Sequence, residues 1–443
     1  MVTKQLKLGI FFQFPGQHVA AWRHPNTRSD IFNLEYFKEL AKTAERGKFD
    51  MIFFADLFGY EPSKYQANYN FKVDPTVLVA SLAAVTQNIG LTATATTTYN
   101  EPFQIARRYA GIDHLSNGRV AWNVVTSANP DEAKLFGKTQ HLSHKDRYAR
   151  AEEFVEVTKK LWLSVGEKGI VADKEKGIYI DESQFNRVQH KGEWFEVDGY
   201  LDIPATPQGH PVIIQAGSSE AGKELAAKTA EVVFTAWQTV EEGQAFYSDL
   251  KGRLTKYGRT KDDLKIMPGA YIIVGETEEA AFAKKRYYDE LITPEIGLDY
   301  LSEHFGFDLS GEDVNAPIPE KYYVVDETDP QIGPKIVNDL IQRNGLKTLK
   351  DLYEFIGGGR RHLEIIGSAQ QVADVLEKWL VLEAADGFNI LPPIFPDDLE
   401  DITNLLIPEL QRRGLFRTEY EGTTLRDNLG LKKPTLQQLT TVR

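Results

Sequence analysis

Short apolar segments alternate with longer amphipathic segments along most of this chain. Eight of the apolar segments are rich in β-branched or aromatic residues and are bounded by polar residues, glycine or proline, a pattern that is typical of buried strands. Most of them are followed by a segment whose apolar residues recur at helical spacing. The predicted strands are residues 6–12, 51–56, 90–98, 120–127, 212–219, 231–237, 265–275 and 387–391.

This alternation predicts a parallel α/β protein, and eight units favour a closed (β/α)8 TIM barrel over an open sheet. The pattern lapses twice, at about residues 165–210 and 293–362, and both stretches are too long to be plain loops. We therefore expect one barrel domain over residues 1–443. The two stretches are predicted insertions, and residues from about 414 to 443 form a predicted C-terminal tail.

Composition narrows the class of protein further. The 443 residues are 42% hydrophobic and 26% charged, which is ordinary for a globular enzyme with a sizeable core. A formal charge of −13 disfavours nucleic acid or an anionic membrane surface as a partner. The absence of cysteine excludes disulfides, thiolate metal sites and thiol catalysis. Because no apolar run is long enough for a bilayer and the first residues lack a secretory pattern, we expect a cytoplasmic protein.

Four of the predicted strands end in polar residues. In a (β/α)8 barrel the active site lies at the C-terminal ends of the strands, so these residues are candidates for it. Asp56 ends the second strand, and the next three end in residues 94–98, 123–127 and 217–219. Only Asp56 among these is ionisable, so the lining suits recognition of a polar cofactor better than acid–base chemistry. The alternative is that the hydroxyls only cap helices and satisfy the loop backbone.

The sequence Gln-Ala-Gly-Ser-Ser-Glu at residues 215–220 lies between a predicted strand and a predicted helix. Backbone N–H groups and hydroxyls in this position can face an anion at the helix N-terminus, although Ser219 can equally be an ordinary N-cap. A rival interpretation is a relaxed nucleophile elbow in which Ser219 attacks an ester. That reading needs a downstream histidine, and His304 and His362 both lie in the second predicted insertion.

Two histidines precede or begin the helix predicted at residues 144–162. His141 and His144 are three residues apart, but no HExxH pattern or cysteine accompanies them, so we predict no metal site. His144 and Tyr148 lie one turn apart on the same face of this helix, where both can contact one anion or ring. The alternative is that His144 caps the helix while Tyr148 packs.

Several long motifs resemble one known family. They are DHLSNGRVAWNVVTS, HKDRYARAEEF, HKGEWFEVDG and QAGSSEAG, with shorter matches from WRHP at residues 22–25 to LRDNLGL at residues 425–431. The chain resembles the nitrilotriacetate monooxygenase family, a branch of the bacterial luciferase-like flavin monooxygenases. The resemblance implies a (β/α)8 barrel that binds reduced FMN (FMNH2), activates O2 and inserts one oxygen atom into an organic substrate.

The resemblance also implies which residues contact the flavin. Ser219 with its neighbour Ser218, together with His144 and Tyr148, would hold the phosphate end. Asp56 and Thr94 would lie nearer the ring. No protein residue is assigned a catalytic role, because the flavin carries the chemistry.

Partners follow from the same resemblance. No GxGxxG sequence follows a strand, so we expect a separate NAD(P)H:FMN reductase to supply FMNH2. The family implies a homodimer or a homotetramer. A deazaflavin-dependent hydride-transfer enzyme on the same barrel and a non-catalytic flavin-binding relative remain alternative functions.

Residues near the strand ends and in the second insertion are candidates for substrate binding. Trp22 and Arg23 follow the first strand, and Arg360 and Arg361 lie in the second insertion, where an arginine can bind a carboxylate with two hydrogen bonds. The alternative for each arginine is a solvated loop charge or an internal ion pair. By resemblance the leading candidate is a carboxylated thioether such as an S-substituted cysteine derivative. Aminopolycarboxylates, sulfones, dialkyl sulfides and long-chain alkanes are the other substrate classes.

Overall fold

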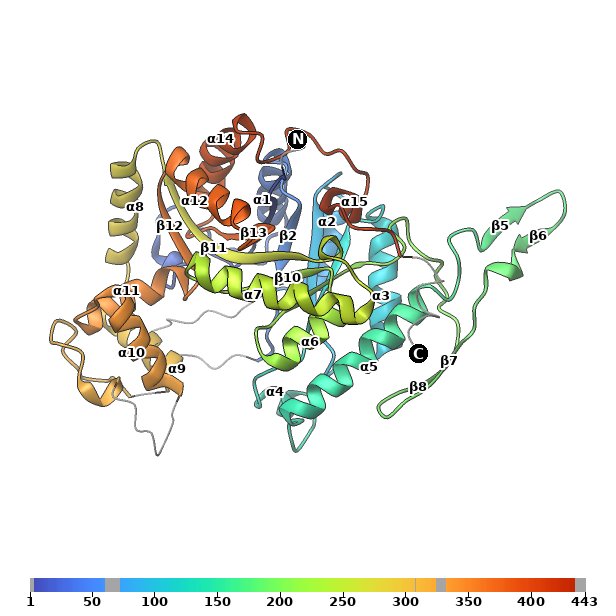
Figure 1. Ribbon diagram of the computed structural model, residues 1–443, viewed down its shortest axis with the longest axis horizontal. Coiled ribbons are helices and arrows are strands. Elements are labelled where there is room, and N and C mark those ends of the chain that lie inside the picture. The colour runs from blue at the N-terminus through green and yellow to red at the C-terminus, as the bar shows by residue number, and fades with distance from the viewer. Residues whose placement is uncertain (1–3, 60–71, 307, 324–331, 435–443) are drawn as a thin grey trace.

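The computed structural model describes residues 4–59, 72–306, 308–323 and 332–434. Eight parallel strands form the closed barrel that the sequence predicted (Figure 1). Neighbours around the ring follow the order β1, β2, β3, β4, β9, β10, β11 and β13, and β13 pairs with β1 to close it. Their bounds are β1 (Lys7–Phe11), β2 (Met51–Phe54), β3 (Gly90–Thr96), β4 (Val120–Val125), β9 (Val212–Ala216), β10 (Val232–Thr235), β11 (Lys265–Gly275) and β13 (Gly387–Leu391).

A ninth parallel strand, β12 (Leu363–Ser368), was not predicted. It pairs with the second half of β11, starting with Leu363 opposite Ala270, while β10 and β13 pair with the first half. The second predicted insertion ended at about residue 362, directly before this strand. The segment is too short to show a strand pattern on its own.

Strand β3 shows how the sequence separates the two faces of the barrel. Leu91, Ala93 and Ala95 pack in the large core between the strands and the surrounding helices. Thr92, Thr94 and Thr96 alternate with them and are also buried. Because successive side chains of a strand point to opposite faces, the threonines face the barrel interior.

Helices surround the barrel. Trp122 of β4 anchors the contact between strands and helices: its indole N–H donates to the Ala95 carbonyl at 3.0 Å, and its ring lies 5.9 Å from Tyr109, 5.8 Å from Phe154 and 6.0 Å from Trp162. The main surrounding helices are α1 (Leu34–Arg46), α2 (Pro75–Ala83), α3 (Pro102–Leu115), α5 (His144–Trp162), α6 (Glu220–Thr229), α7 (Val240–Arg253), α8 (Glu278–Glu290), α12 (Ala369–Val381) and α14 (Ile407–Arg412).

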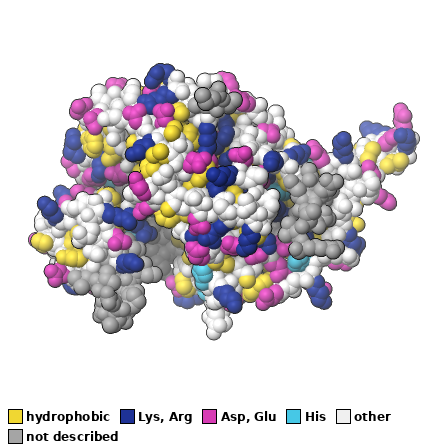
Figure 2. Space-filling model, in the orientation of Figure 1, with side chains coloured by type: hydrophobic (Ala, Val, Ile, Leu, Met, Phe, Trp, Pro, Cys, Tyr) yellow, Lys and Arg dark blue, Asp and Glu magenta, His cyan; other side chains and the backbone are white. Residues whose placement is uncertain are grey.

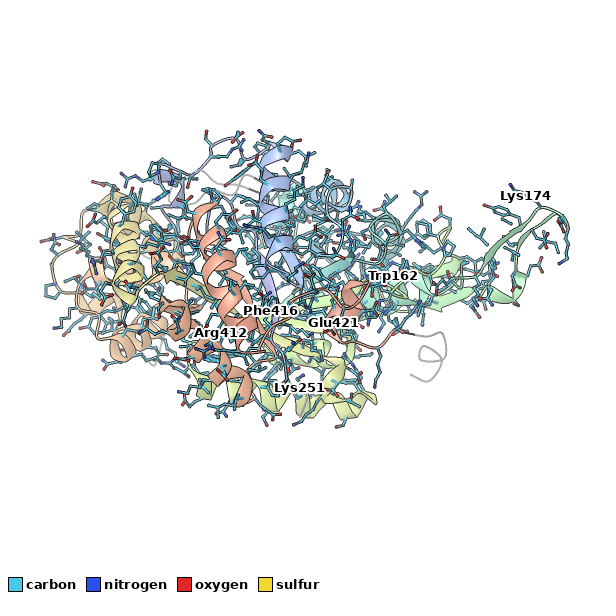
Figure 3. The ribbon with its side chains drawn as sticks, turned by 90° about the horizontal axis from the view of Figure 1, so that it is seen from above. Trp162, Lys174, Lys251, Arg412, Phe416 and Glu421 are labelled. Carbon is cyan, nitrogen blue, oxygen red and sulfur yellow. The ribbon has the colours of Figure 1, made fainter. Side chains whose placement is uncertain are left out.

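The first irregular stretch contains two antiparallel hairpins. β7 (Val188–Lys191) and β8 (Glu196–Gly199) are held to α5 by Glu153, whose carboxylate accepts hydrogen bonds from the backbone at Trp194 and Phe195. β5 (Ile170–Asp173) and β6 (Ile178–Ile180) form an arm that projects from the body of the molecule (Figure 1). Lys174, in the turn of this arm, lies at the far end of the molecule from the barrel (Figure 3).

The second irregular stretch is helical where it is described. α9 (Pro294–Phe305), α10 (Ile332–Asn344) and α11 (Leu349–Gly359) pack beside the barrel around a hydrophobic core of their own. That core also includes Val19, Ala20 and Ala21 from the segment after β1. This helical group therefore packs directly against the β1 loop at the mouth of the barrel.

The described part of the predicted tail covers the other end of the barrel. Leu425 and Leu429 of the short helix α15 (Leu425–Leu429) pack in the apolar cluster that fills the barrel interior. Arg426 is buried and forms an ion pair with Glu231, the residue before β10. The N-terminal end of such a barrel serves stability, so the chemistry belongs at the opposite end. None of the described helices is both long and apolar enough to cross a membrane.

Candidate active site

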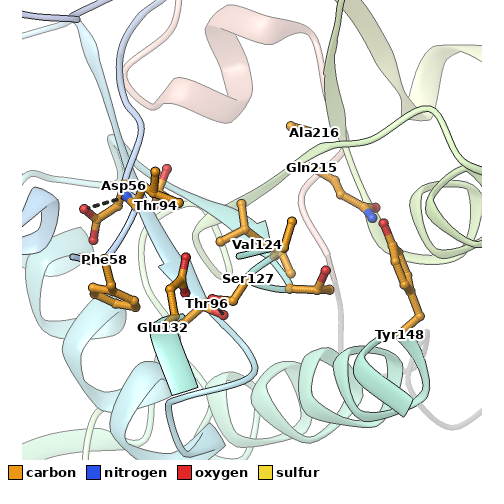
Figure 4. A pocket seen from close by; sticks show the side chains of 14 residues that line it. Asp56, Phe58, Thr94, Thr96, Val124, Ser127, Glu132, Tyr148, Gln215 and Ala216 are labelled. Carbon is orange, nitrogen blue, oxygen red and sulfur yellow. Dashed lines mark hydrogen bonds between the residues drawn. The ribbon is translucent and has the colours of Figure 1, made fainter. Parts of the chain in front are cut away.

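A cavity of about 270 Å³ lies at the C-terminal ends of the barrel strands (Figure 4). Asp56 and Thr94 line one end of it, and Tyr148, Gln215 and Ala216 line the other. The end of β4 and the residues that follow it, 124–128, form the wall between these two ends. The cavity is therefore elongated, with chemically different groups at its two ends.

A chain of hydrogen bonds fixes the barrel side of the cavity. The Asn123 amide donates to the Thr94 hydroxyl at 2.8 Å, and Thr94 donates to the Phe54 carbonyl at 2.7 Å. Burial raises the pKa of the nearby Asp56 carboxyl to about 6, although the positive charge of Lys72 opposes this shift. This end of the cavity thus presents rigid neutral dipoles and one carboxyl that titrates near neutral pH.

The wall between the two ends is held by an arginine that no local sequence pattern indicated. Arg147 of α5 is buried and donates to the carbonyl oxygens of Thr126 at 3.1 Å and Ser127 at 2.7 Å. Ser127 has a left-handed φ of 53° and donates its hydroxyl proton to Thr96 at 2.9 Å. Because a left-handed conformation is unfavourable for serine, these contacts compensate for its cost and fix the wall.

The other end of the cavity adjoins the N-terminus of α6. A Cβ atom added to Gly217 would lie 3.8 Å from the Tyr148 hydroxyl oxygen, and one added to Gly222 would lie 3.4 Å away. The Tyr148 hydroxyl thus lies directly over the first turn of this helix, where free backbone N–H groups and the helix dipole favour an anion. Figure 4 shows the side chains of Gln215 and Tyr148 pointing toward one another here.

The predicted cofactor residues fall into three groups. Asp56, Thr94 and Tyr148 line the same cavity. His144 is exposed, but its ring lies 4.7 Å from that of Tyr148, so it is adjacent to the α6 end. Ser218 and Ser219 are exposed at the start of α6. The Ser219 hydroxyl accepts from the Gly222 amide at 3.1 Å, so it is the N-cap that the sequence allowed, and Ser143 rather than His144 caps α5.

The two predicted substrate residues do not line this cavity. Trp22 and Arg23 lie in the 3-10 helix η1 (Ala21–Arg23), and both side chains are exposed. Arg23 donates a hydrogen bond to the Leu291 carbonyl, which ties the β1 loop to the chain just before α9. A role in substrate binding stays a prediction for both residues.

Several buried polar atoms around the cavity have no hydrogen-bond partner among the described residues. They are Oε2 of Glu132, Oε1 of Gln215, Oδ1 of Asn123 and Nε of Arg147. Buried polar groups are normally paired, and Glu132 and Gln215 line the cavity, where a polar ligand can pair with them. The sequence hinted at Gln215 and Asn123 through their places at strand ends, but it gave no sign that Glu132 of the short helix α4 (Glu132–Leu135) is buried.

The geometry does not support Ser219 as a nucleophile, nor His141 and His144 as a metal-binding pair. The ring of His304 stacks on Tyr300 and that of His362 on Phe234, and among the described residues no histidine lies within hydrogen-bond distance of the Ser219 hydroxyl. A serine nucleophile with a histidine base is therefore wrong. His141 Nδ1 bonds to the Tyr99 hydroxyl at 2.7 Å, and the described part of the chain contains no group of three or more potential metal ligands.

Comparison with known proteins places the chain in a family. Residues 7–379 match the family described as luciferase-like monooxygenase. The chain is 48% identical to nitrilotriacetate monooxygenase component A of Aminobacter aminovorans, with 98% of each chain covered. It is also 48% identical to N-acetyl-S-(2-succino)cysteine monooxygenase of Bacillus subtilis (strain 168), with 97% of this chain and 98% of the relative covered.

Solved structures agree with this assignment. The crystal structure of DmoA from Hyphomicrobium sulfonivorans matches with a TM-score of 0.86 and 32% identity, over 96% of this chain and 92% of that one. The structure of riboflavin lyase (RcaE) with modified FMN and riboflavin matches with a TM-score of 0.82 and 30% identity, over 98% of both chains. The chain therefore belongs to the luciferase-like monooxygenases, flavin-dependent oxidoreductases, as its motifs predicted.

Proposed function

We propose that this chain is the oxygenase of a two-component monooxygenase, which uses externally supplied FMNH2 and O2 to oxygenate a small organic substrate. The observation that carries the proposal is the elongated cavity, which adjoins the N-terminus of α6 at one end and is lined by the polar side chains of Asp56 and Thr94 at the other. A phosphate requires the first kind of end, and a flavin ring with its carbonyl and N–H groups requires the second. The residues present therefore fit FMN.

The positions of the predicted cofactor residues support a role for each of them. Tyr148, His144, Ser218 and Ser219 surround the α6 end and would hold the phosphate. Asp56 and Thr94 line the opposite end and would contact the ring. The bound cofactor would supply the oxygen activation, while the protein orients it and excludes water.

Aromatic side chains beside the cavity provide a means of excluding water. Phe58 lines the cavity and packs edge-on against Phe136 at 5.0 Å, and Phe136 stacks on Tyr99 at 4.4 Å with an interplanar angle of 2°. Tyr99 is fixed in turn by its hydrogen bond to His141. We propose that these three rings shield the reacting centre from solvent.

The source of FMNH2 decides whether the enzyme has two components. The purified chain should be mixed with FMN, NADH and a panel of sulfur-containing and amine substrates, with and without a separate NAD(P)H:FMN reductase. We expect an oxygenated product, detected as a mass gain of one oxygen atom, only when the reductase is present. Rapid NADH oxidation by the chain and FMN alone would contradict the two-component proposal.

For the substrate we propose a small carboxylated thioether, such as an S-substituted cysteine derivative. The two relatives at 48% identity are named for nitrilotriacetate and for N-acetyl-S-(2-succino)cysteine, and both of these compounds carry several carboxylates. The second is also a thioether. Conversion of long-chain alkanes or dialkyl sulfides in place of carboxylated compounds would overturn this choice.

We also propose that the chain forms a homodimer or a homotetramer through its projecting arm. Ile170, Val171, Ile178, Tyr179 and Ile180 of the β5–β6 hairpin are all exposed, Tyr179 to 66%. Hydrophobic side chains are visible on this arm in Figure 2. Consecutive strand residues point to opposite faces, so both faces of the arm are apolar. A two-stranded hairpin is marginal in water by itself, and a second copy of the chain would cover these side chains.

A further inference from the structure

Two consecutive arginines follow the last turn of α11. Arg360 and Arg361 both adopt left-handed backbone conformations, with φ of 47° and 69°. Non-glycine residues rarely adopt such values, and two in succession turn the chain sharply between α11 and β12. The turn places both arginines at the junction between the helical group α9–α11 and the barrel, where Arg360 is half-buried and Arg361 is exposed.

Neither arginine has an anionic partner among the described residues. The Arg360 Nε atom is buried without a hydrogen-bond partner, and its guanidinium lies 6.0 Å from the centre of the Tyr300 ring. Arg417 and Arg426 are buried in ion pairs with Asp50 at 2.5 Å and with Glu231, and the buried guanidinium of Arg147 donates to two backbone carbonyl groups. A buried guanidinium atom left unpaired is costly, so this site differs from the structural ion pairs of the chain.

The groups around the arginines do not neutralise their charge. Burial and the positive charges of the two arginines lower the pKa of both His304 and His362 to about 4. Both histidines are therefore neutral at pH 7. The nearby carboxyl of Glu364 is also largely buried, and its pKa is raised to about 7 by that burial. Among the described residues, neither arginine forms an ion pair with a carboxylate, including that of Glu303, whose charge also acts on Tyr300 beside them.

This junction is connected to the candidate active site. The His362 ring, next to Arg361 in the chain, stacks on Phe234 with ring centres 5.5 Å apart. Phe234 is the register partner of Ala216 on the neighbouring strand, and Ala216 lines the cavity. Adjacent strands are about 4.8 Å apart, so the path from His362 to the cavity runs over the Phe234 ring and one strand spacing.

We propose that Arg360 and Arg361 bind a carboxylate of the substrate and thereby hold its reacting atom toward the cavity. A guanidinium binds a carboxylate through two parallel hydrogen bonds, and two adjacent guanidinium groups suit a substrate with more than one carboxylate. The apolar part of such a substrate would lie against His362 and Phe234. This inference rests on the proposed function, because it assumes that the cavity is where oxygenation occurs.

The test uses the FMN-loaded chain with N-acetyl-S-(2-succino)cysteine and with its methyl esters, which lack the negative charges. Calorimetric binding to oxidised, FMN-loaded protein and kcat/KM with a reductase are both measured. We expect the dissociation constant to rise at least tenfold for the esters, for Arg360→Gln and for Arg361→Gln. Arg361→Lys should recover part of the loss. Arg108→Gln serves as the control, because Arg108 is exposed on α3 away from this junction.

The outcomes separate this inference from the proposed function. FMN titration and thermal unfolding of each variant are recorded first, so that a folding defect is recognised. If a glutamine variant does not fold, the Arg361→Lys variant and the methyl esters decide whether the arginines bind the carboxylate. If the wild type oxygenates the free acid and its esters equally well, or if the glutamine variants match Arg108→Gln, the carboxylate site is wrong while the monooxygenase remains. If the folded wild type takes up no FMN, both proposals are overturned.

Discussion

Asn123 and Thr94 lie opposite one another on β4 and β3, and the Asn123 amide donates a hydrogen bond of 2.8 Å to the Thr94 hydroxyl. Thr94 in turn donates to the Phe54 carbonyl, so one chain of hydrogen bonds joins three neighbouring strands at the barrel mouth. The Asn123 carbonyl oxygen is buried without a partner among the described residues. Thr94 lines the cavity, so this chain of hydrogen bonds fixes the orientation of its hydroxyl there.

Removing the Thr94 hydroxyl should disrupt this arrangement. We expect Thr94→Val to lower the free energy of unfolding by about 1–3 kcal/mol, because the buried Asn123 amide loses its acceptor. FMN should also bind more weakly, because the amide is no longer held in one orientation. Urea unfolding and a fluorescence titration with FMN measure the two effects. Thr94→Ser keeps the hydroxyl and is the control; equal losses in both variants would argue against the hydrogen bond as the cause.

Tyr148 offers a test of which end of the cavity holds the phosphate. Tyr148→Phe should weaken FMN binding by about tenfold, because a hydrogen bond to a charged group contributes about 1.5–3 kcal/mol. Riboflavin has no phosphate, so its affinity should not change. Tyr179→Phe, in the exposed arm, is the matched control. A similar loss for FMN and riboflavin would place the phosphate elsewhere.

The ring cluster at the cavity predicts a defect in water exclusion. Phe136→Ala removes the ring that contacts both Phe58 and Tyr99. With FMNH2 supplied, we expect a larger share of the consumed O2 to appear as hydrogen peroxide instead of oxygenated substrate, because solvent reaches the reacting centre. An oxygen electrode combined with a peroxide assay measures this share. Leu135→Ala, a neighbouring exposed side chain, should leave it unchanged.

The sequence predicted the barrel because each of its strands carries a local signal. The Leu-Thr-Ala-Thr-Ala-Thr sequence of β3, for example, alternates between a face toward the helices and a threonine face toward the interior. Likewise, helix α5 begins at His144, as predicted. Its N-cap is Ser143, whose hydroxyl accepts a hydrogen bond from the Asp146 amide. Periodicity and capping act over a few residues, so they can be read without knowing the tertiary structure.

Other features depend on contacts between distant parts of the chain. Nothing local marks Arg147 as the residue that holds the end of β4, since its partners are the carbonyl groups of residues 20 and 21 positions earlier. Nor does the sequence show that Arg426 reaches Glu231, 195 positions away, to close the base of the barrel. For the cavity, motif resemblance pointed to Tyr148, which lines it, whereas the buried state of Glu132 required the folded chain.

The raised pKa of Asp56 predicts a pH dependence of stability. Its folded-state pKa is about 6, against an unfolded value near 3.9, so between about pH 4 and 6 the folded state keeps a proton that the unfolded state has lost. The free energy of unfolding therefore falls as pH rises through this window. Asp56→Asn should remove this loss and be more stable than the wild type at pH 7, by at most about 3 kcal/mol.

Urea unfolding of wild type and Asp56→Asn at pH 5 and pH 7 measures the difference. The advantage of the variant should grow with pH. Asp339→Asn, an exposed carboxylate on α10, controls for the change in net charge and should show no such growth. An advantage that stays constant between the two pH values would mean that Asp56 does not titrate in this window.

The projecting arm predicts the route of self-association. Ile178→Ser combined with Tyr179→Ser replaces two exposed apolar side chains of β6, so the contact with a second copy should lose apolar burial and the complex should dissociate toward monomers. Light scattering coupled to size-exclusion chromatography measures the mass directly. Val381→Ser on α12 removes an apolar side chain that is 69% exposed elsewhere on the surface, and it should leave the mass unchanged. A double variant that keeps the wild-type mass would exclude the arm as the interface, and a monomeric wild type would exclude the oligomer itself.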